Sequence, residues 1–135
     1  MNIAIDIDDT LTESFDYFLP YVAEYFDVDE ETLRKQNISY SNLPKEWKKD
    51  EIGFCRAYYD RIVPGTPFKQ DAAWGVKRLR ELGHRIVIIT ARTDALYTDP
   101  YQTTEQELAN GGICYDKLIC TFDKAKACVE EEISV

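Results

Sequence analysis

The stretch NIAIDIDDTLT, from Asn2 to Thr12, decides the fold, because an apolar run stops there at three carboxylates in four residues. The β-branched run at residues 3–5 predicts a buried strand in a sheet that is covered on both faces. Asp6, Asp8 and Asp9 follow at the carboxyl end of this strand. The sequence therefore predicts a cluster of carboxylates at one edge of a sheet.

The spacing of these carboxylates favours a metal site. Alternate side chains of an extended backbone share a face, so we expect Asp6 and Asp8 to converge while Ile7 points into the protein. Crowded carboxylates need a neutralising cation or a shared proton, and Mg²⁺ prefers hard oxygen ligands. Open α/β sheets also bind ligands at the carboxyl ends of their strands. The alternative interpretation is a solvated acidic turn after a strand.

Composition limits the classes of partner. The 135 residues predict one domain with a real core, and 16 basic against 25 acidic residues give a net charge of -9. This charge argues against nucleic acid or an anionic membrane bound through general electrostatics. With no basic leader and no apolar run of about 18 residues, we interpret the protein as cytoplasmic. Its cysteines lack zinc-site spacing and are interpreted as small buried or half-buried thiols: Cys55, Cys114, Cys120 and Cys128.

The residues after the acidic cluster have helical spacing. Apolar and aromatic residues between 15 and 26 fall on one helical face, and Pro20 is interpreted as the start of a new helix. Asp29 predicts the cap of a short helix to about residue 35, and a third helix is expected over 45–62. No strand is predicted here. We therefore expect residues 13–63 to form a helical insertion over the carboxyl end of the first strand.

The second half of the chain alternates helices and strands. The sole histidine, His84, precedes a strand at the end opposite the acidic cluster, so we do not expect it to be catalytic. This alternation predicts an α/β fold with a parallel sheet in three layers. The predicted helices cover 69–82, 100–110 and 124–131; the strands cover 84–90 and 117–121, and Ile133 to Val135 opens a fourth.

Three polar features are expected at the ends of successive strands, and together they suit phosphoryl transfer. One carboxylate can form an aspartyl-phosphate and a second can protonate the leaving alkoxide. A hydroxyl, backbone N–H groups and an ammonium can hold the phosphoryl oxygens. The alternatives are a turn threonine, a surface arginine in an ion pair and a solvated lysine. The residues are Asp6 and Asp8 after the first strand, Thr90, Ala91 and Arg92 after the second, and Lys124 after the third.

At these residues the sequence resembles the haloacid dehalogenase superfamily of phosphatases. Its first motif is matched by Asp6-Ile7-Asp8-Asp9-Thr10 and its second by Ile88-Ile89-Thr90. Its third is matched by Lys124 in Phe122-Asp123-Lys124, with Lys117 as the second choice. The resemblance covers essentially the whole chain. It implies a Rossmann-like core of residues 1–12 and 64–135, with a helical cap of residues 13–63.

The resemblance also implies roles for the site residues. Asp6 is expected to be the nucleophile and a Mg²⁺ ligand, and Asp8 the general acid/base and a metal ligand through its backbone carbonyl. Thr90 is expected to bind phosphate and Lys124 to neutralise charge and bind substrate. The rest of the expected substrate-binding set is Asp9, Ala91 and Arg92; for Asp9 a cap, a hydrogen-bond acceptor and a metal ligand are the alternatives.

Within the superfamily the chain looks most like cytosolic-type 5′-deoxyribonucleotidases and related bacterial proteins. The likeness rests on the Val63-Pro64-Gly65 turn, the triplet at 90–92 and the Asp123-Lys124 pair. It implies a Mg²⁺-dependent phosphatase acting on a nucleotide or a similar small phosphorylated metabolite. The aromatic residues of the insertion are expected to form its core or to stack on a base: Tyr17, Tyr40, Trp47 and Tyr59.

Two departures from this pattern leave other functions open. Asp9 stands where those nucleotidases usually carry Gly, and the acidic pair of the fourth motif would follow Val135, where the sequence stops. We therefore expect weak Mg²⁺ binding, slow turnover, and either a homodimer through the first-strand edge or low stability. The alternative function is a non-catalytic binding or interaction protein on the same scaffold. A receiver-type signalling domain is disfavoured, because a long helical stretch follows the first strand.

Overall fold

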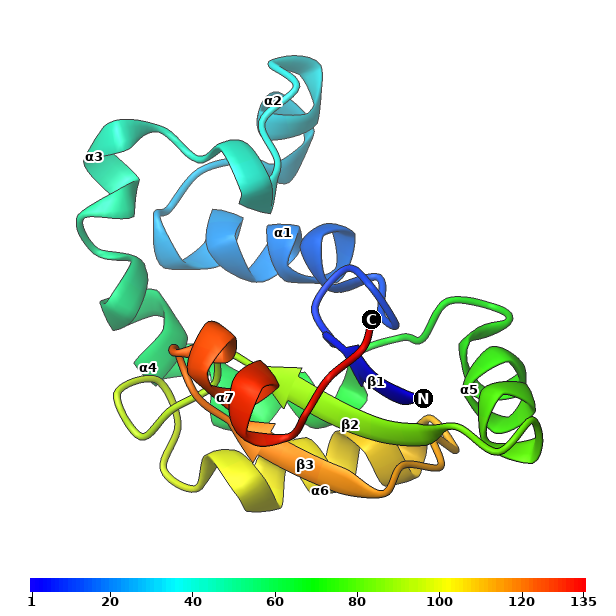
Figure 1. The fold of residues 1–135 in the computed structure, drawn as a ribbon. Helices are drawn as coiled ribbons and strands as arrows, with labels where there is room; N and C mark the ends of the chain where they lie inside the picture. Colours follow the sequence, from blue (N-terminus) through cyan, green and yellow to red (C-terminus); the bar gives the residue numbers. More distant parts are fainter.

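Three parallel strands form the sheet in the order β1-β2-β3. They are β1 (Asn2–Ile5), β2 (Arg85–Thr90) and β3 (Lys117–Cys120). β2 is the central strand: it pairs with β1 on one side and with β3 on the other. This computed structural model describes residues 1–135 and confirms the predicted α/β class and the parallel sheet (Figure 1).

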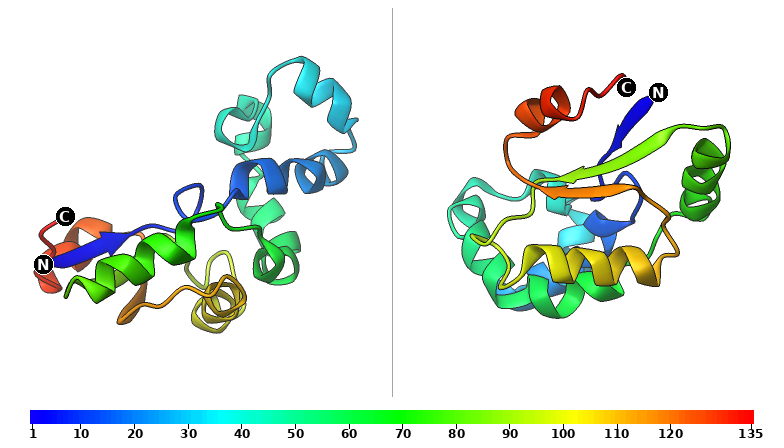
Figure 2. Two further views of the ribbon diagram at one scale, coloured as in Figure 1. Left: turned by 90° about the vertical axis from the view of Figure 1, so that its right-hand side faces the viewer. Right: turned by 60° about the horizontal axis from the view of Figure 1, so that its bottom comes forward.

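Helices cover both faces of this sheet. Alternate residues of β2 point to opposite faces, so Ile86 and Ile88 pack in one apolar cluster and Val87 and Ile89 in another. The first cluster includes residues of α5 (Ala72–Glu81) and α6 (Pro100–Asn110), and the second includes a residue of α7 (Lys124–Glu130). The sheet is therefore the middle of three layers, with α6 and α7 on opposite sides (Figure 2).

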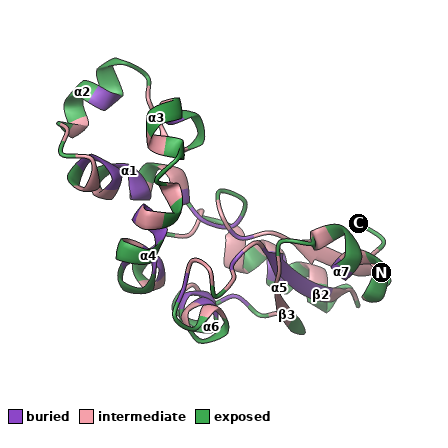
Figure 3. Ribbon diagram, turned by 90° about the vertical axis from the view of Figure 1, so that its left-hand side faces the viewer, coloured by how far each residue is buried: buried purple, intermediate pink, exposed green.

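A helical insertion separates β1 from α5 and contains no strand. It comprises α1 (Ser14–Tyr25), α2 (Glu30–Lys35), α3 (Lys45–Lys48) and α4 (Glu51–Ile62), with single turns at η1 (Tyr40–Asn42) and η2 (Val63–Gly65). The first three helices extend away from the sheet as a separate lobe (Figure 2). The insertion as a whole has its own buried residues on α1 and α4 (Figure 3), including Phe18, Val22 and Phe54.

Two short segments connect the insertion to the sheet, and they run side by side. Thr12 and Phe68 form an antiparallel bridge. Glu13 N–H donates to Pro67 O at 2.8 Å, and Lys69 N–H donates to Leu11 O at 2.8 Å. These bonds lie close to the predicted boundaries of the insertion.

Three predicted helix boundaries are wrong. Pro20 lies inside α1 on its exposed side, because residues before and after it pack in the same buried cluster and hold one continuous helix. The helix predicted over 45–62 is broken before Glu51, where Asp50 Oδ2 accepts a hydrogen bond from Tyr25 Oη at 2.7 Å. α5 begins at Ala72, three residues later than predicted, and Lys69 belongs to the connecting segment, where its N–H donates to Leu11 O.

The last residues of the sequence lie along the outer edge of β1. Ser134 N–H donates to Asn2 O at 2.8 Å, and Ala4 N–H donates to Val135 O at 2.8 Å. Residues 133–135 thus take the place expected for the opening of a fourth strand. No helix of this fold has the length and apolar character needed to cross a lipid bilayer.

Candidate active site

An exposed ion pair joins the ends of two elements. Asp6 directly follows β1, and Lys124 is the first residue of α7, which Asp123 caps by accepting from Lys126 N–H at 3.0 Å. Lys124 Nζ lies 2.8 Å from Asp6 Oδ2, and the two side chains are 37% and 41% exposed. Lys117 begins β3 at the far end and pairs with Glu131. The fold thus brings Lys124, and not the second choice Lys117, to Asp6.

Asp8 has a different set of partners. Ile7 is fully buried, as predicted, and separates the two carboxylates along the chain. Asp8 Oδ1 accepts from Ser14 Oγ at 2.9 Å and from Arg92 Nη2 at 3.0 Å. Asp8 Oδ2 has only one contact, with Arg92 Nε at 3.4 Å. One oxygen of Asp8 is therefore firmly held, and the other is weakly bound.

Arg92 connects Asp8 to the interior of the protein. Its side chain is 2% exposed, so it is not the surface arginine considered as an alternative. Arg92 Nη1 donates to Glu107 Oε2 and, at 3.2 Å, to Thr104 Oγ1. Both partners lie on α6, and Glu107 is fully buried. A buried guanidinium therefore bridges a carboxylate at the strand ends and a carboxylate on a helix.

This network shifts the pKa of its two buried members upward. Burial alone would lower the pKa of Arg92, but the nearby charges of Asp8 and Glu107 outweigh it and raise that pKa well above its ordinary value. Burial raises the pKa of Glu107, and Arg92 opposes this effect only in part. Arg92 therefore stays charged between its two acidic partners.

Thr90 ends β2 with a buried side chain whose hydroxyl has no hydrogen-bond partner. Its backbone carbonyl accepts from Thr121 N–H at 2.8 Å. Burying a hydroxyl without a partner costs free energy, so such a group is a candidate for contact with a ligand. Ala91 follows in the same turn and has only backbone groups to offer a ligand.

Asp9 occupies a turn with a positive φ of 59°. This left-handed region favours Gly, and Asp tolerates it better than most other residues. Asp9 O accepts from Lys69 Nζ at 2.7 Å, and its N–H donates to Thr12 Oγ1 at 3.4 Å. The carboxylate of Asp9 is exposed, and its backbone tethers the turn to the connecting segment.

The oxygen atoms near Asp6 suit Mg²⁺. The backbone carbonyl of Asp8 accepts no backbone hydrogen bond, and Asp6 offers a partly exposed carboxylate. Carboxylate and carbonyl oxygens are the protein ligands that Mg²⁺ takes, usually together with water and phosphate oxygens. No group of three or more His, Cys, Asp or Glu side chains is arranged to hold a metal ion.

A hollow of about 400 Å³ lies between α4 and the loops that follow β2 and β3. Its apolar lining includes Ile52 of α4 and Phe122, which are 55% and 63% exposed. Phe122 lies two residues before Lys124 in the sequence, and neither Lys124 nor Asp6 lines the hollow. Lys48 and Lys49 lie at the same hollow, and neither forms an ion pair.

The aromatic residues predicted for base stacking are used inside the insertion. Tyr17 Oη donates to Ile62 O at 2.8 Å, and the Tyr40 and Tyr59 hydroxyls bond to each other. Trp47 stacks on Phe26, with ring centroids 4.5 Å apart. These contacts favour the expectation that the aromatic residues form the core of the insertion.

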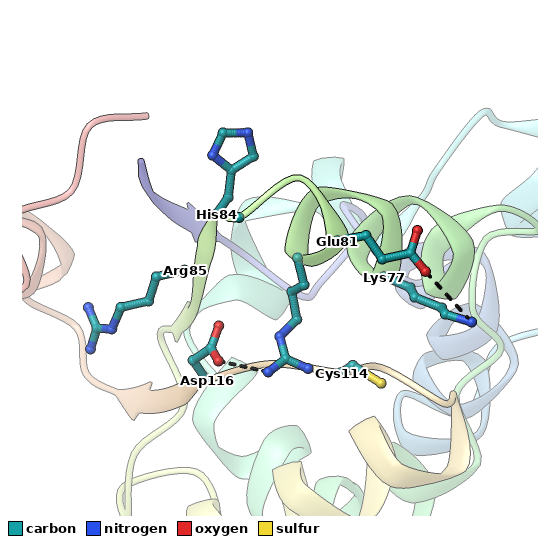
Figure 4. A pocket seen from close by; sticks show the side chains of 8 residues that line it. Lys77, Glu81, His84, Arg85, Cys114 and Asp116 are labelled. Carbon is teal, nitrogen blue, oxygen red and sulfur yellow. Dashed lines mark hydrogen bonds and ion pairs between the residues drawn. The ribbon is translucent and has the colours of Figure 1, made fainter.

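A larger hollow of about 730 Å³ lies at the opposite end of the sheet (Figure 4). Its charged side chains are largely paired: Arg80 Nη2 lies 2.8 Å from Asp116 Oδ1, and Lys77 pairs with Glu81. His84 lies at this end too, beside the terminal amino group, and is therefore far along the strand from the acidic cluster. Because these charged groups are paired with each other, they offer few free groups to a ligand in this hollow.

The fold and the site define a class of α/β protein whose parallel sheet gathers an Asp–Lys pair, a buried Asp–Arg–Glu network and an unpartnered hydroxyl at its carboxyl ends. No model of a known protein family matches this sequence, and no curated protein matches it. Sequence reasoning missed three members of the network: Ser14, Thr104 and Glu107. In the sequence these residues are marked only as polar residues at positions of a helix that face the core.

Proposed function

We propose that this protein is a Mg²⁺-dependent phosphatase of the haloacid dehalogenase type, which hydrolyses a small phosphorylated metabolite such as a nucleotide. The observation that carries the proposal is the Asp6–Lys124 pair at 2.8 Å, beside a strand whose last residue, Thr90, has a buried unpartnered hydroxyl. An exposed carboxylate can act as the nucleophile of such a reaction, and a cation and a free hydroxyl can stabilise charge on the phosphoryl oxygens.

In the first step Asp6 is the nucleophile. An oxygen of its carboxylate bonds to phosphorus while the bond from phosphorus to the leaving oxygen breaks. Asp8 gives a proton to this leaving oxygen, so that an alcohol departs and the phosphoryl group stays on Asp6. The weakly bound Oδ2 of Asp8, with its single 3.4 Å contact, is the oxygen suited to proton transfer.

In the second step water replaces the enzyme at phosphorus. Asp8 takes a proton from the water as its oxygen bonds to phosphorus, and the bond from phosphorus to Asp6 breaks. Inorganic phosphate leaves, and both carboxyl groups return to their initial states. Throughout, Lys124 and Thr90 bind the phosphoryl oxygens, and the backbone at Ala91 adds N–H donors.

Mg²⁺ would be held by the Asp6 carboxylate and the Asp8 carbonyl, and when bound it would neutralise charge on the phosphoryl oxygens. Lys124 Nζ pairs with Asp6 Oδ2 at 2.8 Å. In this proposal Lys124 therefore orients the nucleophilic carboxylate and neutralises part of its charge.

We assign residues 13–63 to a cap that covers the site and the hollow beside Phe122 to the leaving group of the substrate. The hollow is lined by apolar side chains together with Glu51, Lys48 and Lys49, and apolar walls with a few polar groups suit a flat leaving group. Arg92 already donates hydrogen bonds to Asp8, Thr104 and Glu107. The expected contact between Arg92 and the substrate stays a prediction.

The test is turnover of 4-nitrophenyl phosphate with Mg²⁺ and with EDTA. We expect Mg²⁺-dependent hydrolysis by the wild-type protein and none by Asp6→Asn, because an amide is a poor nucleophile. Asp94→Asn is the matched control, since Asp94 is exposed and outside the proposed site. A wild-type protein that binds phosphorylated metabolites without hydrolysing them would instead support the non-catalytic alternative.

A further inference from the structure

Glu107 and Thr104 lie outside the site but hold its arginine. Both side chains are fully buried on α6, and both accept a hydrogen bond from Arg92 Nη1. Arg92 Nη2 and Nε then donate to the two oxygens of Asp8. α6 is thereby linked to Asp8 through a single side chain.

We propose that Glu107, supported by Thr104, is a positioning residue that acts through Arg92 to fix the Asp8 carboxylate. This inference rests on the proposed function, in which Asp8 transfers the proton. Ser14 and Arg92 hold Oδ1, so Oδ2, with its single contact at 3.4 Å, is the oxygen assigned to proton transfer.

The geometry of guanidinium makes this link rigid. Its nitrogens lie in one plane, so a contact that fixes Nη1 also fixes the directions of Nη2 and Nε. A contact with Glu107 therefore determines where the two donors to Asp8 point. The single contact of Oδ2, with Arg92 Nε, is long at 3.4 Å, so the network orients the Asp8 carboxylate but binds Oδ2 only weakly.

The burial of the network also points to a positioning role. Taking a guanidinium and a carboxylate out of water costs free energy that packing alone does not require, and well-packed apolar residues often serve stability better. Arg92 and Glu107 are 2% and 0% exposed, and one oxygen of Glu107 has no partner. An apolar residue at 107 would fill the space but would leave Arg92 held by Thr104 alone on the α6 side.

The kinetic test compares two substrates in the Glu107→Gln variant, with Glu105→Gln on the exposed side of α6 as the matched control. An alkyl phosphate needs a proton on its leaving oxygen, whereas 4-nitrophenyl phosphate hardly does. We expect kcat/KM, which reports only the steps up to release of the leaving alcohol, to fall about tenfold or more for the alkyl phosphate and much less for the aryl phosphate. An equal loss on both substrates would mean a merely structural role and would overturn the proposal.

A second test does not depend on turnover. Asp8→Asn and Glu107→Gln each leave Arg92 with one carboxylate, but the double variant leaves a buried cation with none. We therefore expect the double variant to lose more stability than the two single losses combined, by about threefold or more in the unfolding equilibrium constant. Additive losses would show that the residues are not linked and would overturn the proposal. The pair Asp8→Asn and Glu105→Gln should be additive.

These tests separate the inference from the proposed function. If the wild-type protein lacks turnover but the stability cycle is non-additive, the proposed function fails and the link between α6 and Asp8 stands. If turnover is normal but Glu107→Gln has no effect that depends on the leaving group, the positioning role fails alone.

A second variant serves if Glu107→Gln does not fold. Thr104→Val removes the other contact between Arg92 and α6, and we expect it to give the same dependence on the leaving group with a smaller loss. A Thr104→Val protein with equal losses on both substrates would overturn the proposal in that case.

Discussion

Arg92 is a buried cation that depends on two carboxylates. Its partners Asp8 and Glu107 come from the end of β1 and from α6, so the residue joins parts of the chain that are far apart in sequence. A buried ion pair contributes little net stability compared with apolar packing, but the loss of one member leaves charge buried without compensation. The side chain should therefore be hard to replace.

We predict that Arg92→Met destabilises the protein by about 3–5 kcal/mol, because it leaves the buried Glu107 carboxylate without its cation. Urea denaturation at pH 7 measures this loss. Arg78→Met is the matched control: its pair with Glu81 is exposed, and such pairs contribute about 0–1 kcal/mol. Similar losses in the two variants would contradict the proposed network.

The residues of the first motif could be predicted from sequence, whereas their buried partners could not. Asp6 and Asp8 follow a strand signal directly, and Thr90 ends the next one, so local spacing is enough to place them. Glu107 is different, because its contact with Arg92 depends on the rotation of α6 against the sheet. A buried Glu on a helix face is visible in the sequence only as an exception to the apolar pattern.

At the scale of the element, the start of α7 carries the proposed phosphate-binding lysine. Asp123 caps this helix, and Lys124 is its first residue. An N-cap side chain satisfies a free backbone N–H and sets the direction in which the first turn leaves the loop. The cap therefore also sets the position from which Lys124 reaches Asp6.

We predict that Asp123→Ala costs about 0.5–2 kcal/mol of stability and raises KM for 4-nitrophenyl phosphate, because the first turn of α7 loosens. Asp123→Asn should retain most of both properties, since Asn is an equally good N-cap. Denaturant midpoints and steady-state kinetics on the two variants provide the measurement. An Asn variant as impaired as the Ala variant would point to a direct role for the Asp123 charge.

Asp116 accepts hydrogen bonds that link the segment before β3 to β2 and α5. Asp116 Oδ2 accepts from Ile86 N–H at 2.8 Å, and Asp116 Oδ1 accepts from Arg80 Nη2 at 2.8 Å. The backbone hydrogen bond from Ile86 and then the Arg80 guanidinium lower the pKa of Asp116. A carboxyl whose pKa is lower in the folded state stabilises the fold above the unfolded pKa, and this contribution is lost as the pH falls through the folded pKa.

We therefore predict that Asp116→Asn costs about 1 kcal/mol at pH 7. The difference from wild type should persist down to about pH 4, the ordinary Asp pKa, and then shrink as the pH falls further. Urea midpoints measured from pH 7 to pH 2.5, about 1.5 units below that pKa, test this expectation. A difference that grows on acidification would have the wrong sign.

Element type could be predicted more reliably than element boundaries. The strands and the capped helices have local signals: Asp29 and Asp99 each accept from a first-turn N–H, as their sequence positions predict. Because Pro costs a helical hydrogen bond, Pro20 predicts a helix start, but apolar packing before and after it in α1 outweighs that cost. The break before α4 depends on Tyr25, which only the folded insertion brings to Asp50.

In the whole molecule, the candidate site lies at the carboxyl ends of the strands, where the three-layer core meets the helical insertion. The two connecting segments pair through Thr12 and Phe68. The insertion also contacts the rest of the protein through α4 and η2: Arg56 donates to Ala95 O at 2.9 Å, and Pro64 O accepts from Asn110 Nδ2 at 2.8 Å. The α/β class and the order of the elements can be predicted from the alternation of strand and helix signals. The pairing of the two connecting segments cannot be predicted in this way, because it joins residues separated by the entire insertion.

The proposed mechanism requires that Asp6 carries the phosphoryl group during turnover. The most direct measurement is mass spectrometry of protein that has been quenched in acid while it hydrolyses 4-nitrophenyl phosphate with Mg²⁺. We predict a phosphoryl group on the peptide that contains Asp6 in the wild-type protein, and none in Asp6→Asn. Turnover without any phosphoryl group on that peptide, or undiminished turnover by Asp6→Asn, would contradict the account.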